Sequence, residues 1–169
     1  ACGGLNPTFM PGDLMLITDQ LNFSWNNPLI GRPDDMLGAR FPDMSKPFDP
    51  GLITLAEEQA ERLDIPLQKG VFTWVTGPNY ETAAEVRMLH KLGGDAVSMS
   101  TAPEVIVAVQ RHLQVMGVSL ITNLGTGLSS DILDHADVTR VAHTSGLLLQ
   151  QLLRHVIANL PELETKAKK

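Results

Sequence analysis

Two short segments of the sequence combine residue types that could recognise a flat heterocyclic molecule. The first is Gly77-Pro-Asn-Tyr-Glu81, which follows an apolar run and places an aromatic ring beside a carboxylate. An aromatic face packs against planar ligands, and an ionised carboxylate accepts a hydrogen bond from a ring N–H. Taken alone, Glu81 could equally be a first-turn charge that the helix dipole favours, with Tyr80 simply packing.

The second segment is Ser119-Leu-Ile-Thr-Asn123, an apolar run that ends in an asparagine. The amide of Asn123 offers a donor and an acceptor, so it could bind a ring nitrogen and a carbonyl; the alternative is a turn-forming role. Met99 and Ser100 end a third short run. Met99 could be a core residue and Ser100 or Thr101 a helix cap, although a helix N-terminus is also an anion site.

The remaining polar residues suggest no metal or nucleotide chemistry. The sequence has five histidines, and four of them fall in expected helices without metal-ligand spacing. His135 differs because it lies in a polar loop before the last helix. There is no nucleophile elbow, no P-loop and no dinucleotide fingerprint, which disfavours acyl transfer and nucleoside triphosphate hydrolysis.

Apolar periodicity and turn residues predict the elements that must position these segments. Strands are expected at 12–18, 70–76, 95–99 and 115–122, and helices at 50–63, 81–92, 101–113 and 137–160, with a capping box formed by Thr101 and Glu104. The alternation after residue 70 predicts an α/β fold with a mixed, mostly parallel central sheet flanked by helices. If the strands are parallel neighbours, the three polar segments meet at the carboxyl ends of the strands.

Composition places the chain among soluble globular proteins. Its 169 residues, 43% of them hydrophobic, suit one domain, and the formal net charge of -6 argues against nucleic-acid or anionic-membrane partners. The 161–169 tail with its terminal lysines is expected to be solvated, and the single Cys2 predicts a reducing, cytoplasmic setting. Because the chain starts at Ala1 without signal-peptide character, we expect it to be part of a longer protein.

Three segments together resemble one known family in their order and spacing. They are Gly77-Pro-Asn-Tyr-Glu-Thr-Ala-Ala-Glu-Val86, Asp95-Ala-Val-Ser-Met-Ser-Thr-Ala-Pro-Glu-Val105 and Ser119-Leu-Ile-Thr-Asn123. They are similar to the trimeric, low-molecular-mass purine nucleoside phosphorylases of the inosine and guanosine type. The resemblance also takes in residues 1–22, Phe41-Pro42 and the loop around His135. It implies a single, partial nucleoside phosphorylase domain over 1–169 that lacks the amino-terminal half with the phosphate loop.

The resemblance also implies roles for individual residues. The purine would be bound by five side chains: Tyr80, Glu81, Val97, Met99 and Asn123. Met99, His135 and Phe41 would contact ribose, Phe41 in the site of the neighbouring subunit. Ala1 and Ser100 would contact phosphate, and Asn123 and His135 would be the catalytic residues.

The implied reaction is phosphorolysis of 6-oxopurine (deoxy)ribonucleosides to the free base and (deoxy)ribose 1-phosphate, in purine salvage. Inorganic phosphate would be the co-substrate, with no metal or organic cofactor, and the protein would be a homotrimer with the 20–49 loop near a subunit interface. Asn123 favours 6-oxopurines, since an aspartate at this position would suit a 6-amino base, as in methylthioadenosine phosphorylases. A non-catalytic purine-binding remnant and a methylthioadenosine-type enzyme are the alternatives.

Two departures from the family pattern bear on the pocket. Ser98 stands where the family usually has glycine, and Gln20 where it often has histidine. Because the family sheet is continuous across both halves, we also expect this part to expose an unpaired strand edge.

Overall fold

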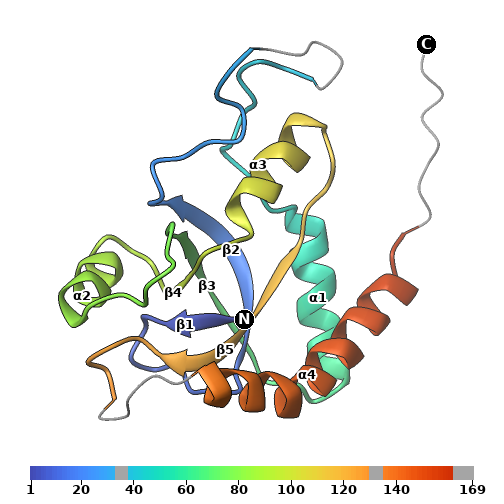
Figure 1. The fold of residues 1–169 in the computed structure, drawn as a ribbon. Coiled ribbons are helices and arrows are strands. Elements are labelled where there is room, and N and C mark those ends of the chain that lie inside the picture. Colours follow the sequence, from blue (N-terminus) through green and yellow to red (C-terminus); the bar gives the residue numbers. More distant parts are fainter. Residues whose placement is uncertain (33–37, 130–134, 162–169) are drawn as a thin grey trace.

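The computed structural model describes residues 1–32, 38–129 and 135–161, except the side chains of His135 and Asp137 (Figure 1). The elements alternate along most of the chain: β1 (Cys2–Gly4), β2 (Leu14–Asn22), α1 (Pro50–Arg62), β3 (Leu67–Trp74), α2 (Ala83–Lys91), β4 (Ala96–Ser98), α3 (Ala102–Gln110), β5 (Gly117–Leu124) and α4 (His135–Ala158). The expected α/β class is confirmed. Within the described residues, none of these helices has the length and apolar character needed to cross a membrane.

The five strands form one closed barrel in the order β1-β4-β3-β2-β5, with β1 pairing back to β5. The pairs β2–β3, β3–β4 and β1–β5 are parallel, and β1–β4 and β2–β5 are antiparallel. The expected mixed, mostly parallel sheet is therefore present. The expected open sheet with an unpaired edge is wrong for the described strands, because β1 pairs on both sides and closes the barrel.

Strand β2 is buried on both faces, as its continuous apolar sequence predicts. Leu14 and Leu16 belong to a cluster with residues of α1 and α4, whereas Met15 and Ile17 belong to a second cluster with residues of β1, β3 and α3. The strand runs to Asn22, so the first three residues of the expected 20–49 loop belong to β2. From residue 23 to 49 the described residues form no helix or strand.

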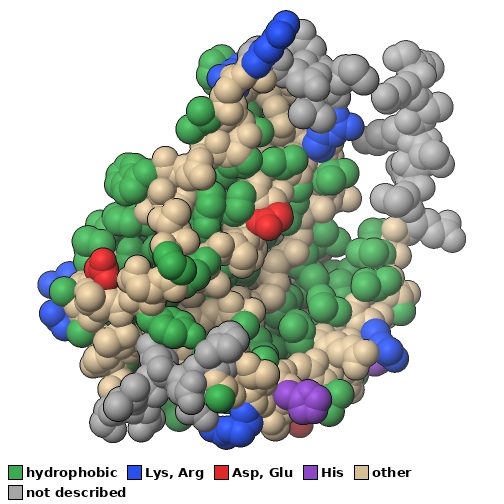
Figure 2. Space-filling model, in the orientation of Figure 1, with side chains coloured by type: hydrophobic (Ala, Val, Ile, Leu, Met, Phe, Trp, Pro, Cys, Tyr) green, Lys and Arg blue, Asp and Glu red, His purple; other side chains and the backbone are tan. Residues whose placement is uncertain are grey.

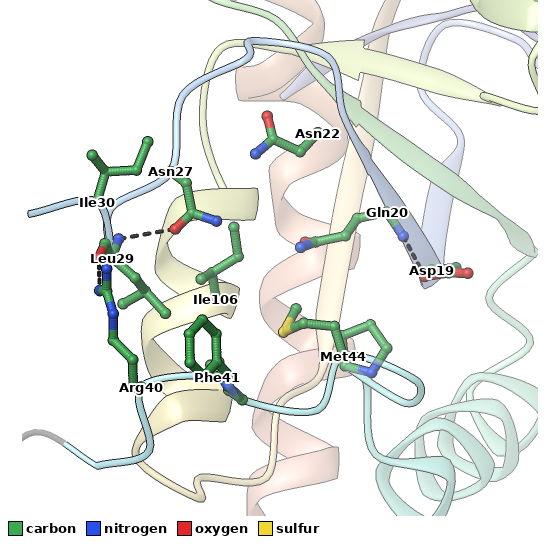
Figure 3. A pocket seen from close by; sticks show the side chains of 12 residues that line it. Asp19, Gln20, Asn22, Asn27, Leu29, Ile30, Arg40, Phe41, Met44 and Ile106 are labelled. Atoms are coloured by element: carbon green, nitrogen blue, oxygen red, sulfur yellow. Dashed lines mark hydrogen bonds between the residues drawn. The ribbon is translucent and has the colours of Figure 1, made fainter. Parts of the chain in front are cut away.

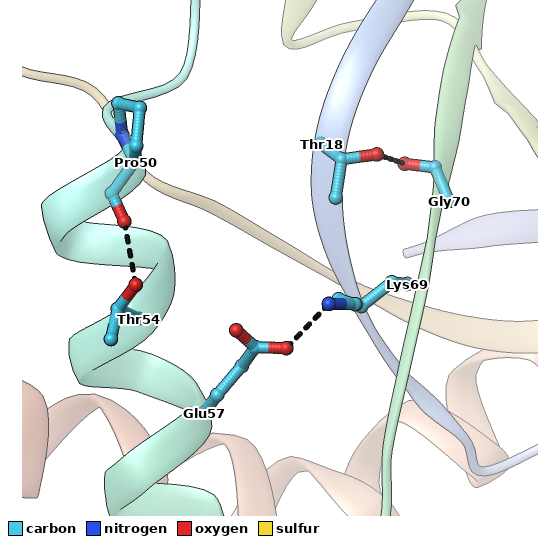
Figure 4. A network of polar contacts seen from close by, with 6 residues as sticks. All are labelled: Thr18, Pro50, Thr54, Glu57, Lys69 and Gly70. Atoms are coloured by element: carbon cyan, nitrogen blue, oxygen red, sulfur yellow. Dashed lines mark hydrogen bonds and ion pairs between the residues drawn. The ribbon is translucent and has the colours of Figure 1, made fainter.

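Helices α1 and α4 lie against each other on the side of the barrel formed by β2 and β5 (Figure 1). Lys69 of β3 reaches across to Glu57 of α1 in an ion pair of 2.6 Å, and the Thr18 hydroxyl of β2 donates to the Gly70 carbonyl of β3 (Figure 4). Lys69 and Glu57 are about half exposed, so their pairing adds little stability. Apolar burial holds this side together.

Hydrophobic side chains gather on the face seen in Figure 2, with few charged side chains among them. Among the described residues, the exposed apolar side chains of α4 are Leu147 at 70%, Leu148 at 42% and Ile157 at 66%.

The helix starts agree with the sequence at one position and differ at another. Asp49 caps α1 as predicted: its carboxylate accepts from Gly51 N at 2.8 Å and Leu52 N at 3.0 Å. The capping box expected at Thr101 and Glu104 is wrong. Thr101 has φ of 76°, far from the extended conformation of an N-cap, and its side chain makes no capping bond.

Candidate functional site

A hollow of about 430 Å³ opens where β1, β4 and β5 meet. Residues from five parts of the fold line it: Ala1 and Gly3 from β1 and its start, Tyr80 and Glu81 from the β3–α2 connection, Val97 and Met99 from β4 and its end, Thr122 and Asn123 from β5, and Val138 from α4. We call this hollow the base pocket. It brings together all five residues that the sequence predicted for purine binding, together with Ala1.

The three polar segments converge for a reason that differs in part from the expectation. Strands β3 and β4 are parallel neighbours, so their ends deliver Tyr80 and Met99 to the same edge. Strand β5 is not a neighbour of either. It reaches the pocket through β1, in which Gly3 pairs with Val97 on one side and Asn123 on the other.

Glu81 lies half-buried at the pocket, two residues before the start of α2. Burial raises the pKa of its carboxyl above the usual value, and the charge of nearby Glu85 acts in the same direction. Glu85 itself is fixed by Thr82, whose backbone N–H and hydroxyl donate to it at 2.7 and 2.9 Å. The Glu85 backbone N–H donates in turn to the Thr82 hydroxyl at 3.3 Å, which completes the capping box of α2 and positions the chain just after Glu81.

Tyr80 and Met99 form the open apolar rim of the pocket, 41% and 40% exposed, whereas Val97 is buried at 3%. Met99 packs against the backbone of Gly77, which has φ of +65°. A Cβ at residue 77 would overlap the Met99 sulfur. The glycine of the Gly77-Pro78 turn therefore supplies both the left-handed conformation and the space that Met99 occupies.

The structure does not place three of the sequence-predicted site residues, Ser100, His135 and Phe41, in the base pocket. Ser100 lines a separate hollow with Thr101 and Glu104 at the start of α3, and its hydroxyl lies 3.3 Å from that of Thr101. The side chain of His135 lies outside the described residues, although α4 begins there and Val138, one turn later, lines the base pocket.

Phe41 is the third residue, and it is 89% exposed. It lines another hollow, of about 500 Å³, between the 23–49 segment, the end of β2 and α3. Figure 3 shows Phe41 beside Met44 and Ile106 there, with the Gln20 side chain extending from β2. The Arg40 guanidinium lies 5.8 Å from the Phe41 ring centre, a distance suited to a cation–π contact.

Several pocket residues were missed by sequence reasoning. Gly3, Thr122 and Val138 line the pocket without having been expected there, and Ser98, the departure from the family pattern, lines it too. The Ser98 hydroxyl donates to the Ala1 carbonyl at 3.1 Å, linking β4 to the start of β1. Thr122 is the sequence neighbour of a predicted site residue, Asn123, which was the available signal. No sequence signal pointed to Gly3, because glycine is disfavoured in strands. Among the described residues no three His, Cys, Asp or Glu side chains gather as metal ligands would.

Comparison with known proteins decides the family. Residues 1–158 match the family model described as the phosphorylase superfamily. The chain belongs to this superfamily. It is 49% identical over 158 residues to purine nucleoside phosphorylase 1 of Bacillus subtilis, covering 94% of this chain and 58% of that protein. It is 41% identical over 168 residues to the purine nucleoside phosphorylase of Bos taurus, again covering 58% of the relative.

Solved structures of the superfamily agree with this assignment. A purine nucleoside phosphorylase from Schistosoma in complex with hypoxanthine superposes with a TM-score of 0.92 at 36% identity, covering 96% of this chain and 60% of that chain. The Schistosoma mansoni enzyme in complex with inosine gives the same TM-score at 35% identity. The chain thus spans about three fifths of the length of these relatives.

Proposed function

We propose that this chain forms the base-recognising part of a purine nucleoside phosphorylase, which cleaves 6-oxopurine (deoxy)ribonucleosides such as inosine and guanosine with phosphate. The observation that carries the proposal is the base pocket, where Tyr80, Glu81, Val97, Met99 and Asn123 line one hollow. The names of the relatives and the hypoxanthine, guanosine and inosine complexes of the Schistosoma enzyme support it.

The pocket residues suit the chemistry of a departing purine. Glu81 accepts the N–H of the base. The Asn123 amide binds the ring nitrogen and the carbonyl, and its N–H donates toward this edge of the base, on which negative charge develops as the glycosidic bond breaks. Tyr80 and Met99 pack on the faces of the ring. A donor fixed in place where charge develops is worth about 3 kcal/mol in a transition state.

The ribose and phosphate ends involve residues beyond this pocket. Ala1 lies at the pocket, and we assign it to phosphate together with Ser100; His135 and Met99 are assigned to ribose. Phosphate attacks C1' of a cationic ribosyl group as the base leaves, without a metal or organic cofactor. We further propose a cytoplasmic homotrimer, in which the exposed Phe41 of one subunit enters the site of the next.

The test is an assay of inosine cleavage with phosphate by the complete protein and by Asn123→Ala and Glu81→Ala. We expect cleavage in the parent protein and a loss of kcat/KM of about 100-fold or more in Asn123→Ala, from the lost donor. Unchanged kcat/KM in both variants would remove the base pocket from the reaction. Binding of hypoxanthine without any phosphorolysis would instead favour a purine-binding remnant.

A further inference from the structure

Strand β5 carries a β-bulge beside the base pocket. Strand β1 pairs Cys2 with Ile121 and Gly3 with Asn123, so Thr122 is an extra residue between the two pairs. Adjacent side chains of a regular strand point to opposite faces, and a bulge re-aims one of them. As a result Thr122 and Asn123 both line the pocket, and the Thr122 hydroxyl lies 3.0 Å from Asn123 Oδ1.

The Asn123 amide is held at both of its ends. Its Nδ2 donates to the Leu124 carbonyl at 3.1 Å, and its Oδ1 accepts from the Thr122 hydroxyl. Gly3 leaves room for this arrangement, since a Cβ there would lie 3.2 Å from Nδ2. A flipped amide would bring Oδ1 against the Leu124 carbonyl, where two acceptors face each other. The observed orientation leaves one N–H of Asn123 for a ligand.

The Thr122 hydroxyl has a single hydrogen and two acceptors within reach. Besides Asn123 Oδ1 it lies 3.2 Å from the Cys2 carbonyl, and Thr122 is only 3% exposed. If the hydrogen goes to Oδ1, it reinforces the observed amide orientation. If it goes to Cys2, the hydroxyl oxygen accepts instead and matches the flipped amide, which the Leu124 carbonyl opposes.

We propose that Thr122 is a positioning residue that fixes the Asn123 amide as a donor toward the base, and so makes the pocket prefer 6-oxopurines over 6-aminopurines. The inference rests on the proposed function, in which Asn123 meets the base. The free N–H of Asn123 pairs with a ring carbonyl. A 6-amino group is itself a donor at that position and leaves the N–H without an acceptor, which costs binding.

The experiment compares Thr122→Val, which keeps the shape and removes the hydroxyl, with Thr122→Ser, which keeps the hydroxyl. In the complete protein kcat/KM is measured for inosine and for adenosine with phosphate. We expect the inosine-to-adenosine ratio to fall roughly tenfold in Thr122→Val, the usual worth of one hydrogen bond, and to stay within about twofold in Thr122→Ser. A ratio that is unchanged in Thr122→Val, or equally lost in Thr122→Ser, overturns the inference.

A second variant covers the case in which Thr122→Val folds poorly. Thr122→Ala removes the same hydroxyl without setting a methyl group against the Cys2 and Asn123 oxygens, and it should lower the ratio as well; an unchanged ratio there counts against the inference. Calorimetric affinities for hypoxanthine and adenine give the same ratio without catalysis. A parent protein that binds both bases but cleaves no nucleoside would therefore overturn the proposed function, while the affinity ratio still tests Thr122.

Discussion

At the scale of single residues, the binding role proposed for Glu81 is set in an environment that opposes its charge. The carboxyl is half-buried, and burial together with the Glu85 charge raises its pKa. The ionised form accepts a hydrogen bond from a base N–H more strongly than the neutral form, which keeps only an uncharged acceptor oxygen. Base affinity is therefore highest above the raised pKa of Glu81 and weakens as the pH falls through it, at a higher pH than for an ordinary glutamate.

We expect the affinity for hypoxanthine, measured by calorimetry across the acid range, to fall with decreasing pH in the parent protein and not in Glu81→Gln. This fall is the acid limb of the affinity profile. Glu85→Gln is the matched control, because glutamine also completes a capping box but carries no charge. It should move the limb to lower pH by removing the repulsion on Glu81. A limb that stays in place in Glu81→Gln would assign the titration to another group.

Gly77 is the residue through which the turn controls the rim of the pocket. In Gly77→Ala the new Cβ meets the Met99 sulfur, and the residue must also keep a φ of +65°. Both effects displace Met99, so we expect KM for inosine to rise about tenfold or more, the effect of misplacing a substrate-contacting group. Gly93→Ala is the control, since φ there is also positive but a Cβ meets nothing within 4 Å. Equal effects of both substitutions on KM would indicate general strain and not the loss of Met99.

At the scale of elements, the helix starts were predictable where the determinants are local in sequence. Asp49 followed by Pro50 specifies the start of α1 without help from the rest of the chain, and the structure confirms it. Thr101 has the same residue-type signature but not the conformation, because β4 and the Met99-Ser100 segment lead the chain into a positive φ at Thr101. Strand β1 contains two glycines and is formed through its pairing with β4 and β5. Its local sequence therefore did not predict a strand.

The Asp49 cap makes an element-scale prediction for stability. Its carboxylate also accepts from Gln114 Nε2 at 2.9 Å, and this bond, followed by that from Leu52 N, lowers the pKa of Asp49. Asp49→Ala should lower the free energy of unfolding by about 1 to 2 kcal/mol at neutral pH. Because the pKa is lowered by folding, this stabilisation is present above the usual aspartate pKa and lost as the pH falls through the folded value.

Urea unfolding at neutral and at acid pH checks this prediction, with Glu58→Ala on the exposed side of α1 as control. The control should change stability by less than about 0.5 kcal/mol, as for most surface substitutions. A destabilisation by Asp49→Ala that persists undiminished in strong acid would contradict a role for the ionised carboxylate.

At the scale of the whole molecule, closure of the barrel decides which sequence-predicted residues meet. The convergence of the residues assigned to the base was predictable because they lie in contiguous motifs that strand ends deliver to one place. The role of Thr122 was not, since it depends on a register shift between β1 and β5. Phe41 and Ser100 could be assigned only by resemblance: each lines a different hollow, and neither contributes to the base pocket of its own chain.

The exposure of Phe41 makes a prediction about assembly. If Phe41 completes the site of a neighbouring subunit in a trimer, Phe41→Ala and Asn123→Ala damage different parts of one composite site. Each variant alone should have a lower kcat/KM for inosine than the parent protein. For Phe41→Ala we expect a decrease of about tenfold, because the aromatic contact is lost. In trimers assembled from both variants, a subunit with intact Asn123 that borrows Phe41 from its neighbour regains a complete site.

Random mixing of equal amounts places intact Asn123 beside a neighbour with intact Phe41 in about a quarter of the sites of a closed, cyclic trimer. Co-refolded or co-expressed mixtures should therefore exceed the summed activity of the two variants, and separately purified proteins mixed without subunit exchange should not. Asn123→Ala mixed with Glu81→Ala is the internal control, because both side chains line the same pocket of one chain and no neighbour replaces them. If the activity of the Phe41 mixture equals the sum of the two variants, Phe41 lies outside the neighbouring site. The 89% exposure of its side chain would then have to be explained by a different contact.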